Sequence, residues 1–211
     1  MAALDYKKTE RSLYLPGETP SLIEVPPLPF VAVEGRGDPN EAGGEFSRAV
    51  SVLYAISYTI RMSGKGGHPI DGFFAYVVPP LEGWWWSEEG VEAAPGDKSA
   101  FCWRAAIRLP DFATDQVFAW AREEAARKKK LDTSAASRLV VDEGLCVQCL
   151  HRGSYDSEPQ TLAGMQAHLA KEGYRPDLDE RRRHHEIYLG DPRKTPVEKR
   201  KTVLRLPVAS L

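Results

Sequence analysis

The sequence has few cysteines, little net charge and no long apolar run, and each shortage excludes a class of protein. Its 211 residues include three cysteines and carry a formal net charge of −2. No apolar run approaches the length of a membrane span, and a charge so near zero argues against nucleic-acid binding by counterion release. Residues 1–10 lack the apolar region of a signal peptide. An odd number of cysteines without such a signal indicates a reducing compartment, so we expect a cytoplasmic protein with no membrane or nucleic-acid partner.

Several catalytic and cofactor motifs are also missing. No Gly-x-Ser-x-Gly elbow occurs, so a Ser/His/Asp triad is not supported. The run Gly64-Lys65-Gly66-Gly67 lacks the spacing of a phosphate-binding loop. Cys146 and Cys149 lie three apart in a predicted strand and therefore face opposite sides, and no second Cys/His pair stands at zinc spacing. The sequence predicts neither a metal site nor a cofactor.

What the sequence does contain is an ordinary globular composition, 42% hydrophobic and 27% charged, and an order of elements that repeats. Apolar spacing and turn residues predict the elements in each half. In the first half these are strands at 30–34, about 71–78, 82–87 and 101–109, with a helix at about 43–63 and a Gly/Glu-rich turn near 88–98. A second helix follows Thr114, a good N-cap. In the second half they are one or two strands at 140–151, a helix at 159–171, and strands at 184–189 and 202–208.

This repeated order predicts a single α+β unit with pseudo-two-fold symmetry, made of tandem strand–helix–strand–strand modules. Within residues 1–211 we expect an extended, Pro-rich lead-in at 1–27 and a first module at 28–112. A connecting helix at 113–137 and a second module at 138–211 follow. The cleft between two such halves is a usual place for a ligand.

The run Trp84-Trp85-Trp86 directly follows Glu82-Gly83 and holds three of the five tryptophans. A strand with three in a row must present at least one to each face. One face can be core, while the other suits an aromatic-walled pocket for a flat organic molecule. A tryptophan-rich edge of the core is the alternative.

Several motifs occur together along the chain. They are Asp5-Tyr6-Lys7-Lys8, Pro80-Leu81-Glu82-Gly83 with Trp85-Trp86, Trp103, Leu109-Pro110-Asp111-Phe112, Glu143-Gly144, His151-Arg152-Gly153-Ser154-Tyr155, His184-His185-Glu186-Ile187-Tyr188-Leu189 and Asp191-Pro192-Arg193-Lys194-Thr195. With them, nearly the whole chain resembles the GyrI-like small-molecule-binding proteins. The resemblance implies a tandem strand–helix–strand–strand duplication whose cleft holds planar, often cationic molecules against an acidic residue and aromatic walls.

The tryptophan motif and the block at 184–189 are similar to those of a GyrI-like subgroup of hydrolases. These enzymes open the cyclopropane ring of cyclopropanoid DNA-alkylating natural products in an aromatic cage. The chain departs from that pattern at Trp84, where an aliphatic residue is expected, and at Ser154, where Pro is usual. Both departures concern the shape of the pocket and hence the range of substrates.

Glu186 is the first candidate for a catalytic residue. In an extended strand, His184, Glu186 and Tyr188 share one face, while His185 and Ile187 share the other. We expect the apolar set to face the helices and Glu186 and Tyr188 to face the cleft. The alternative is a solvated Glu186 paired with a neighbouring arginine.

Two further groups are candidates for substrate binding, together with His184. Glu82 shares a strand face with Trp84 and Trp86, where partial desolvation would suit acid–base chemistry, although an exposed turn is an equal alternative. Trp86, Trp103 and Tyr155 are predicted cage walls that stack on a planar substrate, although Trp103 and Tyr155 could equally fill a core. Glu143 is either a turn residue or a pocket carboxylate. Tyr54 and Tyr58 are assigned to helix packing, with membership of the cage at the edge of the cleft as the alternative.

These residues predict a hydrolase in which Glu186 activates water, Tyr188 steadies the water or donates to the carbonyl oxygen, and the aromatic side chains hold a planar, possibly cationic ligand. The alternative is a non-catalytic protein that sequesters or senses such molecules. A module that inhibits a topoisomerase is a third reading. The sequence allows a monomer or a homodimer.

Overall fold

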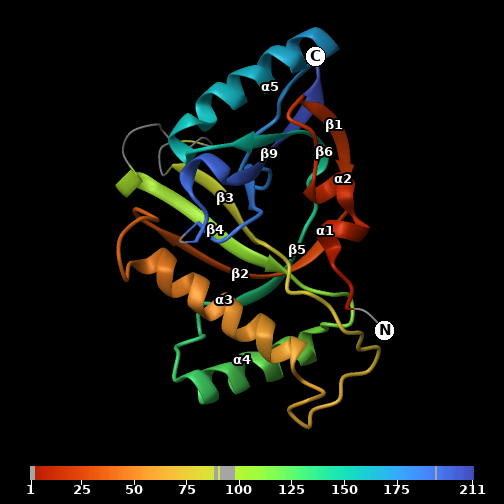
Figure 1. The fold of residues 1–211 in the computed structure, drawn as a ribbon, viewed down its shortest axis with the longest axis vertical. Helices are drawn as coiled ribbons and strands as arrows, with labels where there is room; N and C mark the ends of the chain where they lie inside the picture. The colour runs from red at the N-terminus through yellow and green to blue at the C-terminus, as the bar shows by residue number, and fades with distance from the viewer. Residues whose placement is uncertain (1–2, 88–89, 91–97, 193) are drawn as a thin grey trace.

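The computed structural model describes residues 3–87, 90, 98–192 and 194–211, and within these ranges nine strands form one curled antiparallel sheet (Figure 1). The strands are β1 (Ser21–Val25), β2 (Leu28–Arg36), β3 (Leu81–Ser87), β4 (Phe101–Arg108), β5 (Ser137–Val141), β6 (Gly144–Arg152), β7 (Tyr174–Pro176), β8 (His184–Tyr188) and β9 (Lys201–Ser210). Their order is β1-β6-β9-β8-β3-β4-β2-β5, and β7 pairs with the end of β9. The helices are α1 (Tyr6–Thr9), α2 (Arg11–Tyr14), α3 (Glu45–Arg61), α4 (Asp115–Lys129) and α5 (Glu158–Glu172).

The predicted duplication is confirmed. One module is β2–α3–β3–β4 and the other is β6–α5–β8–β9, and they meet where β3 pairs with β8 at the centre of the sheet. Each module also receives a strand from the other half of the chain. The strand before the first module, β1, pairs with β6, while β5, the strand before the second module, pairs with β2. The two modules therefore share one continuous sheet.

The main helices form where their sequence patterns predict. In α3 the buried face carries Ala49, Leu53, Ile56 and Ile60, and the helix packs against β2 and β4. Thr114 caps α4 as predicted, since its hydroxyl accepts a hydrogen bond from the amide of Val117. The helix α4 covers α3, while α5 packs on β6 and β7 at the other end of the sheet (Figure 1). Among the described residues, no helix is both long and apolar enough to cross a membrane.

The extended lead-in predicted for residues 1–27 is wrong. This segment contains α1, α2 and β1, and the Tyr14 side chain is 1% exposed. The backbone carbonyls of Ser12 and Leu13 accept hydrogen bonds from the side chains of Gln148 and Arg205, respectively. Contacts with the second module therefore order the segment, and a local pattern does not carry that information.

The strand predicted at about 71–78 is also wrong. Tyr76 makes one isolated bridge with Leu4, while Gly72 adopts a positive φ of 74° that interrupts an extended ladder. The sequence analysis did not predict the short strand β7. The turn predicted near 88–98 lies outside the described residues except at positions 90 and 98.

Candidate functional site

A long groove opens on the face of the sheet that carries α3 and α5. Its volume is about 2190 Å³, more than the roughly 300–1,000 Å³ of ordinary small-molecule sites. Every fourth residue along α3 lines it: Phe46, Val50, Tyr54, Tyr58 and Met62. Since a helix rises about 1.5 Å per residue, this stripe is about 24 Å long. The groove can therefore accommodate an elongated molecule.

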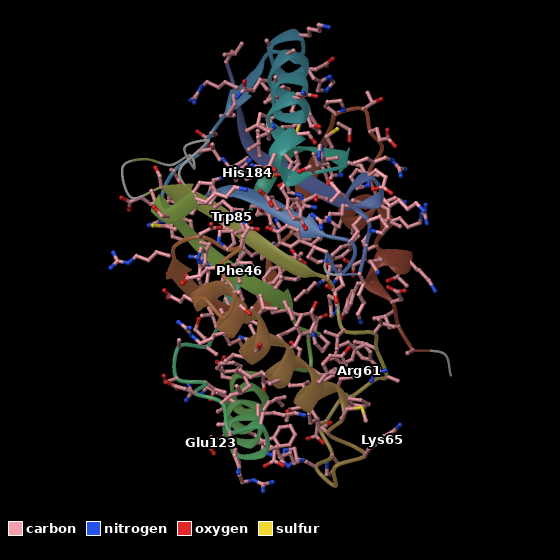
Figure 2. The ribbon with its side chains drawn as sticks, turned by 60° about the vertical axis from the view of Figure 1, so that its left-hand side comes forward. Phe46, Arg61, Lys65, Trp85, Glu123 and His184 are labelled. Carbon is pink, nitrogen blue, oxygen red and sulfur yellow. The ribbon has the colours of Figure 1, made fainter. Side chains whose placement is uncertain are left out.

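One end of the groove is walled by aromatic rings. The ring centroid of Trp85 on β3 lies 5.5 Å from that of Phe46 on α3 and 5.9 Å from that of Phe101 on β4. Across the groove, Tyr155 meets Tyr188 edge to face with centroids 5.8 Å apart. Figure 2 shows His184, Trp85 and Phe46 one below another between α5 and α3. These rings offer flat surfaces to a planar ligand.

A chain of hydrogen bonds crosses the same end. The indole Nε1 of Trp85 donates to the Tyr188 hydroxyl at 2.9 Å, and that hydroxyl donates to Glu186 Oε2 at 2.8 Å. The other carboxylate oxygen, Glu186 Oε1, lies 3.1 Å from His184 Nε2. Burial and the Glu186 carboxylate raise the pKa of Tyr188 well above its ordinary value. Tyr188 therefore stays a hydrogen-bond donor that fixes the direction of the carboxylate.

The strand β8 places these groups by simple alternation. His184, Glu186 and Tyr188 are half-buried and line the groove, whereas His185 and Ile187 are buried on the other face. The expected grouping of side chains is confirmed. The expectation that the apolar side chains face the helices was wrong, because α3 and α5 lie on the groove side. The apolar set instead faces the interior of the curl, where Ile187 belongs to the same core cluster as Tyr14.

Sequence reasoning missed Glu158, the first residue of α5, which lines the groove beside Glu186. Its side chain is 7% exposed and hydrogen-bonds to Glu186 and Thr202. A Glu immediately before Pro159 looks like an exposed residue of a first helical turn. No signal in the local sequence indicates its burial.

Glu82 does not reach the groove. It is 2% exposed on the opposite face, where its Oε2 lies 3.0 Å from His185 Nε2 and its Oε1 accepts a hydrogen bond from Tyr14. The other nitrogen of His185, Nδ1, lies 2.9 Å from Glu143 Oε1, and Arg205 donates to Glu143 Oε2 at 3.0 Å. Glu143 stands in the two-residue connection between β5 and β6, as one of the two predictions had it, but its side chain is buried in an ion cluster and does not line the groove.

The charges in this cluster support each other. Burial alone would raise the pKa of Glu143, but His185 and Arg205 lower it to about 2. Burial alone would lower the pKa of His185, but the carboxylates of Glu143 and Glu82 raise it above its ordinary value. Glu143 and Glu82 thus lie opposite Arg205 and His185 in the interior.

The remaining predicted wall residues are divided between the core and the far face. Trp86 lies on the far side of β3, where the guanidinium of Arg183 stacks 4.9 Å from its ring. Trp103 is fully buried and packs edge to face with Phe46, centroids 5.1 Å apart, behind the groove wall. Trp85, which the sequence analysis did not select, takes the place predicted for them.

Three other predictions concern two tyrosines of α3, the cysteines of β6 and metal binding. Tyr54 and Tyr58 line it, although the sequence analysis assigned them to helix packing. Cys146 and Cys149 are both free, and they pack into different core clusters, as their strand spacing predicts. No group of three or more metal-ligating side chains occurs in the part of the chain that is described.

Gly83 makes the contact between Trp85 and Tyr188 possible, and Gly83→Ala is expected to break it. A Cβ at this position would lie 2.8 Å from Trp85 Nε1 and 3.0 Å from the Tyr188 hydroxyl. Because two rings held in a packed wall must shift, we expect a loss of about 1–3 kcal/mol in the free energy of unfolding. The indole N–H resonance of Trp85 should also move upfield in the NMR spectrum as its hydrogen bond is lost.

Gly164→Ala is the matched control. Gly164 lies exposed within α5, and a Cβ there meets nothing within 4 Å. This variant should keep the Trp85 resonance and gain up to about 1 kcal/mol of helix stability. An unchanged Trp85 resonance in Gly83→Ala would contradict the proposed close approach.

Comparison with known proteins identifies the family. The model of the GyrI-like small-molecule-binding domain matches residues 18–209. This chain belongs to the GyrI-like family. A comparison of the sequence with curated proteins finds no match.

Solved structures are similar to this GyrI-like protein over nearly its whole length. A hydrolase from Listeria innocua is 44% identical, with a TM-score of 0.89 over 98% of this chain and 100% of that one. An uncharacterized conserved protein from Listeria innocua is 46% identical, with a TM-score of 0.92 over the same shares. The C-terminal domain of EcmrR, at 12% identity and a TM-score of 0.54 over 92% of this chain and 98% of that one, shares the fold alone.

Proposed function

We propose that this GyrI-like protein is a hydrolase that opens the cyclopropane ring of cyclopropanoid DNA-alkylating compounds by adding water. One observation carries the proposal: the Glu186 carboxylate is held by Tyr188 and His184 at the aromatic end of the groove. The similarity to a hydrolase from Listeria innocua supports an enzymatic role. The cyclopropanoid substrate follows from the resemblance of the tryptophan motif and of residues 184–189.

The reaction needs a base for water and a place for the charge that develops on the substrate. The water oxygen bonds to a cyclopropane carbon, and the ring C–C bond breaks. Its electron pair moves into the conjugated dienone, whose carbonyl oxygen becomes a phenolate. Glu186 accepts the proton of the water, and the phenolate takes up a proton, so the net change is one added water. Ring strain and aromatisation already favour opening, so positioning contributes much of the catalysis.

The aromatic side chains have a separate task. Trp85 and Phe46 offer ring faces on one side of the groove, and Tyr155 stands beside Tyr188 on the other. They stack on a planar substrate and exclude bulk water from the space before Glu186. In this proposal Trp85 has the role that the sequence analysis gave to Trp86 and Trp103.

The test is mass-spectrometric. The protein is incubated with a cyclopropanoid alkylator in excess, and the product is expected to be heavier by one water after several turnovers. Bound ligand of unchanged mass would overturn the hydrolase proposal.

A second candidate is a binding protein that sequesters planar cations without turning them over. The length of the groove along α3 favours it, because Tyr54 and Tyr58 extend the aromatic wall beyond the region of Glu186. An ionised carboxylate beside aromatic rings also suits a cationic ligand. Calorimetric titration with a planar cation, beside the mass measurement, separates the two candidates.

A further inference from the structure

Two carboxyl groups meet in one wall of the groove. Glu158 comes from the start of α5, where Tyr155 packs against Tyr188 of β8, and its carboxyl group lies beside that of Glu186 in the groove wall, close enough to share a hydrogen bond. Two ionised carboxylates cannot form that bond, because neither has a proton to donate and like charges repel at this distance. One of the two is therefore the carboxylic acid.

The partners of each group decide which one holds the proton. Glu186 accepts from Tyr188 through Oε2 and faces His184 through Oε1, so its charge is supported at both oxygens. Glu158 is buried, and its Oε1 has no hydrogen-bond partner among the residues that the structure describes. A charge on Glu158 would thus be desolvated and poorly compensated. Glu158 is the neutral member of the pair.

The electrostatic environment agrees with this assignment. Burial and the nearby charge of Glu186 raise the pKa of Glu158 to about 10. The N-terminal dipole of α5 favours an ionised carboxylate, but it is a smaller influence than burial combined with a like charge. Thr202 on β9 hydrogen-bonds to Glu158 and also favours ionisation, again with less effect.

We propose that Glu158 is a positioning residue that keeps a proton inside the groove wall and donates it as a hydrogen bond to Glu186. This bond holds the Glu186 carboxylate in place and directed at the water. A carboxylate can accept three such bonds, since its two oxygens offer about four acceptor positions. The part of this proposal that concerns turnover rests on the function proposed above, whereas the shared proton does not.

The carboxyl pair predicts that hydrolytic activity falls at high pH. Once Glu158 ionises, two adjacent negative charges face the substrate and the hydrogen bond is lost. The other titratable groups that interact electrostatically with Glu158 are Tyr188 on β8, and Tyr155 and Asp156 just before α5. Burial raises the pKa of Tyr155 to about 12, so this side chain titrates above Glu158. Tyrosinate absorbance recorded in the same titration distinguishes the tyrosines from the carboxyl.

Two substitutions test the effect on turnover. Glu158→Leu removes the hydrogen bond and is expected to lower kcat about 10–100-fold with a smaller change in KM. Glu158→Gln keeps a neutral donor of the same shape, so it should restore most of the rate and lose the fall in activity near pH 10. A Gln variant as impaired as the Leu variant, or one that keeps the alkaline limb, would contradict the proposal.

Infrared spectroscopy of the ligand-free protein tests the shared proton without turnover. Wild type at pH 8 should show the carbonyl band of a buried carboxylic acid, and Glu158→Gln should lack it. In Glu186→Gln the band should titrate at lower pH, because the like charge is gone. Absence of the band in folded wild type overturns the proposal. If neither wild type nor any variant hydrolyses a cyclopropanoid, the proposed function is wrong, while the infrared evidence for the shared proton still holds.

Discussion

The Glu186→Gln variant is expected to hydrolyse a cyclopropanoid substrate about 10²–10⁴-fold more slowly than wild type. The amide matches the carboxylate in size but cannot accept the proton of the attacking water. The aromatic wall of Trp85, Phe46 and Tyr155 is unchanged, so the affinity for a neutral planar ligand should fall little. Single-turnover mass spectrometry measures the rate of water addition, and the change in tryptophan fluorescence on binding measures affinity.

The matched control is Glu123→Gln. Glu123 is exposed on α4 and far from β8 along the molecule (Figure 2). This variant should hydrolyse at the wild-type rate. If Glu186→Gln did so as well, Glu186 would not be the general base, whatever the protein binds. If both rates fell together, the loss would reflect handling or folding of the variants.

The Glu143→Gln variant is expected to lose about 3–5 kcal/mol of unfolding free energy. It leaves Arg205 and His185 buried with a single opposing carboxylate, Glu82, where two had balanced them. Urea unfolding measures the loss as a lower midpoint at constant slope. The groove lies on the other face of the sheet, so the remaining folded protein should bind ligand normally.

The pH dependence of this stability follows from the direction of each pKa. The pKa of Glu143 is about 2 in the folded protein, against a usual 4.5. Its contribution to the free energy of unfolding is therefore present above about pH 4.5 and is lost as the pH falls toward 2. The pKa of His185 is raised, so its contribution is lost as the pH rises through that value. Glu143→Gln should flatten the acid side of the profile, and an exposed control, Glu198→Gln, should not.

Strand alternation predicted which side chains share a face, but it could not tell which face a ligand would reach. Glu186 was correctly grouped with Tyr188, and Glu82 with Trp86. Both faces of β3 carry aromatic rings, since Trp85 packs beside Phe46 of α3 on one face and Trp84 beside Phe30 on the other. Charge did not separate them either, because acidic side chains lie on both faces: Glu82 and Glu143 in the buried cluster, and Glu158 and Glu186 in the groove wall.

The order of helices and strands was largely predictable because it depends on local periodicity and caps. Thr114 begins α4 and Gly173 ends α5, as local chemistry requires. Residues 1–27 and Glu158 were not predictable, since their burial depends on Gln148, Arg205 and Thr202 elsewhere in the chain. Local patterns predict elements, whereas these contacts decide what the elements cover.

The exchange of strands between modules has a consequence for synthesis of the chain. An N-terminal module leaving the ribosome has no β5 to pair with β2 and no β6 to receive β1, since Leu28 pairs with Val141 and Ser21 with Gln148. Pairings between such distant residues form slowly, and unpaired sheet edges aggregate. A nascent chain paused between the modules is therefore at its most vulnerable to aggregation and proteolysis, and duplication has made each half the obligate folding partner of the other.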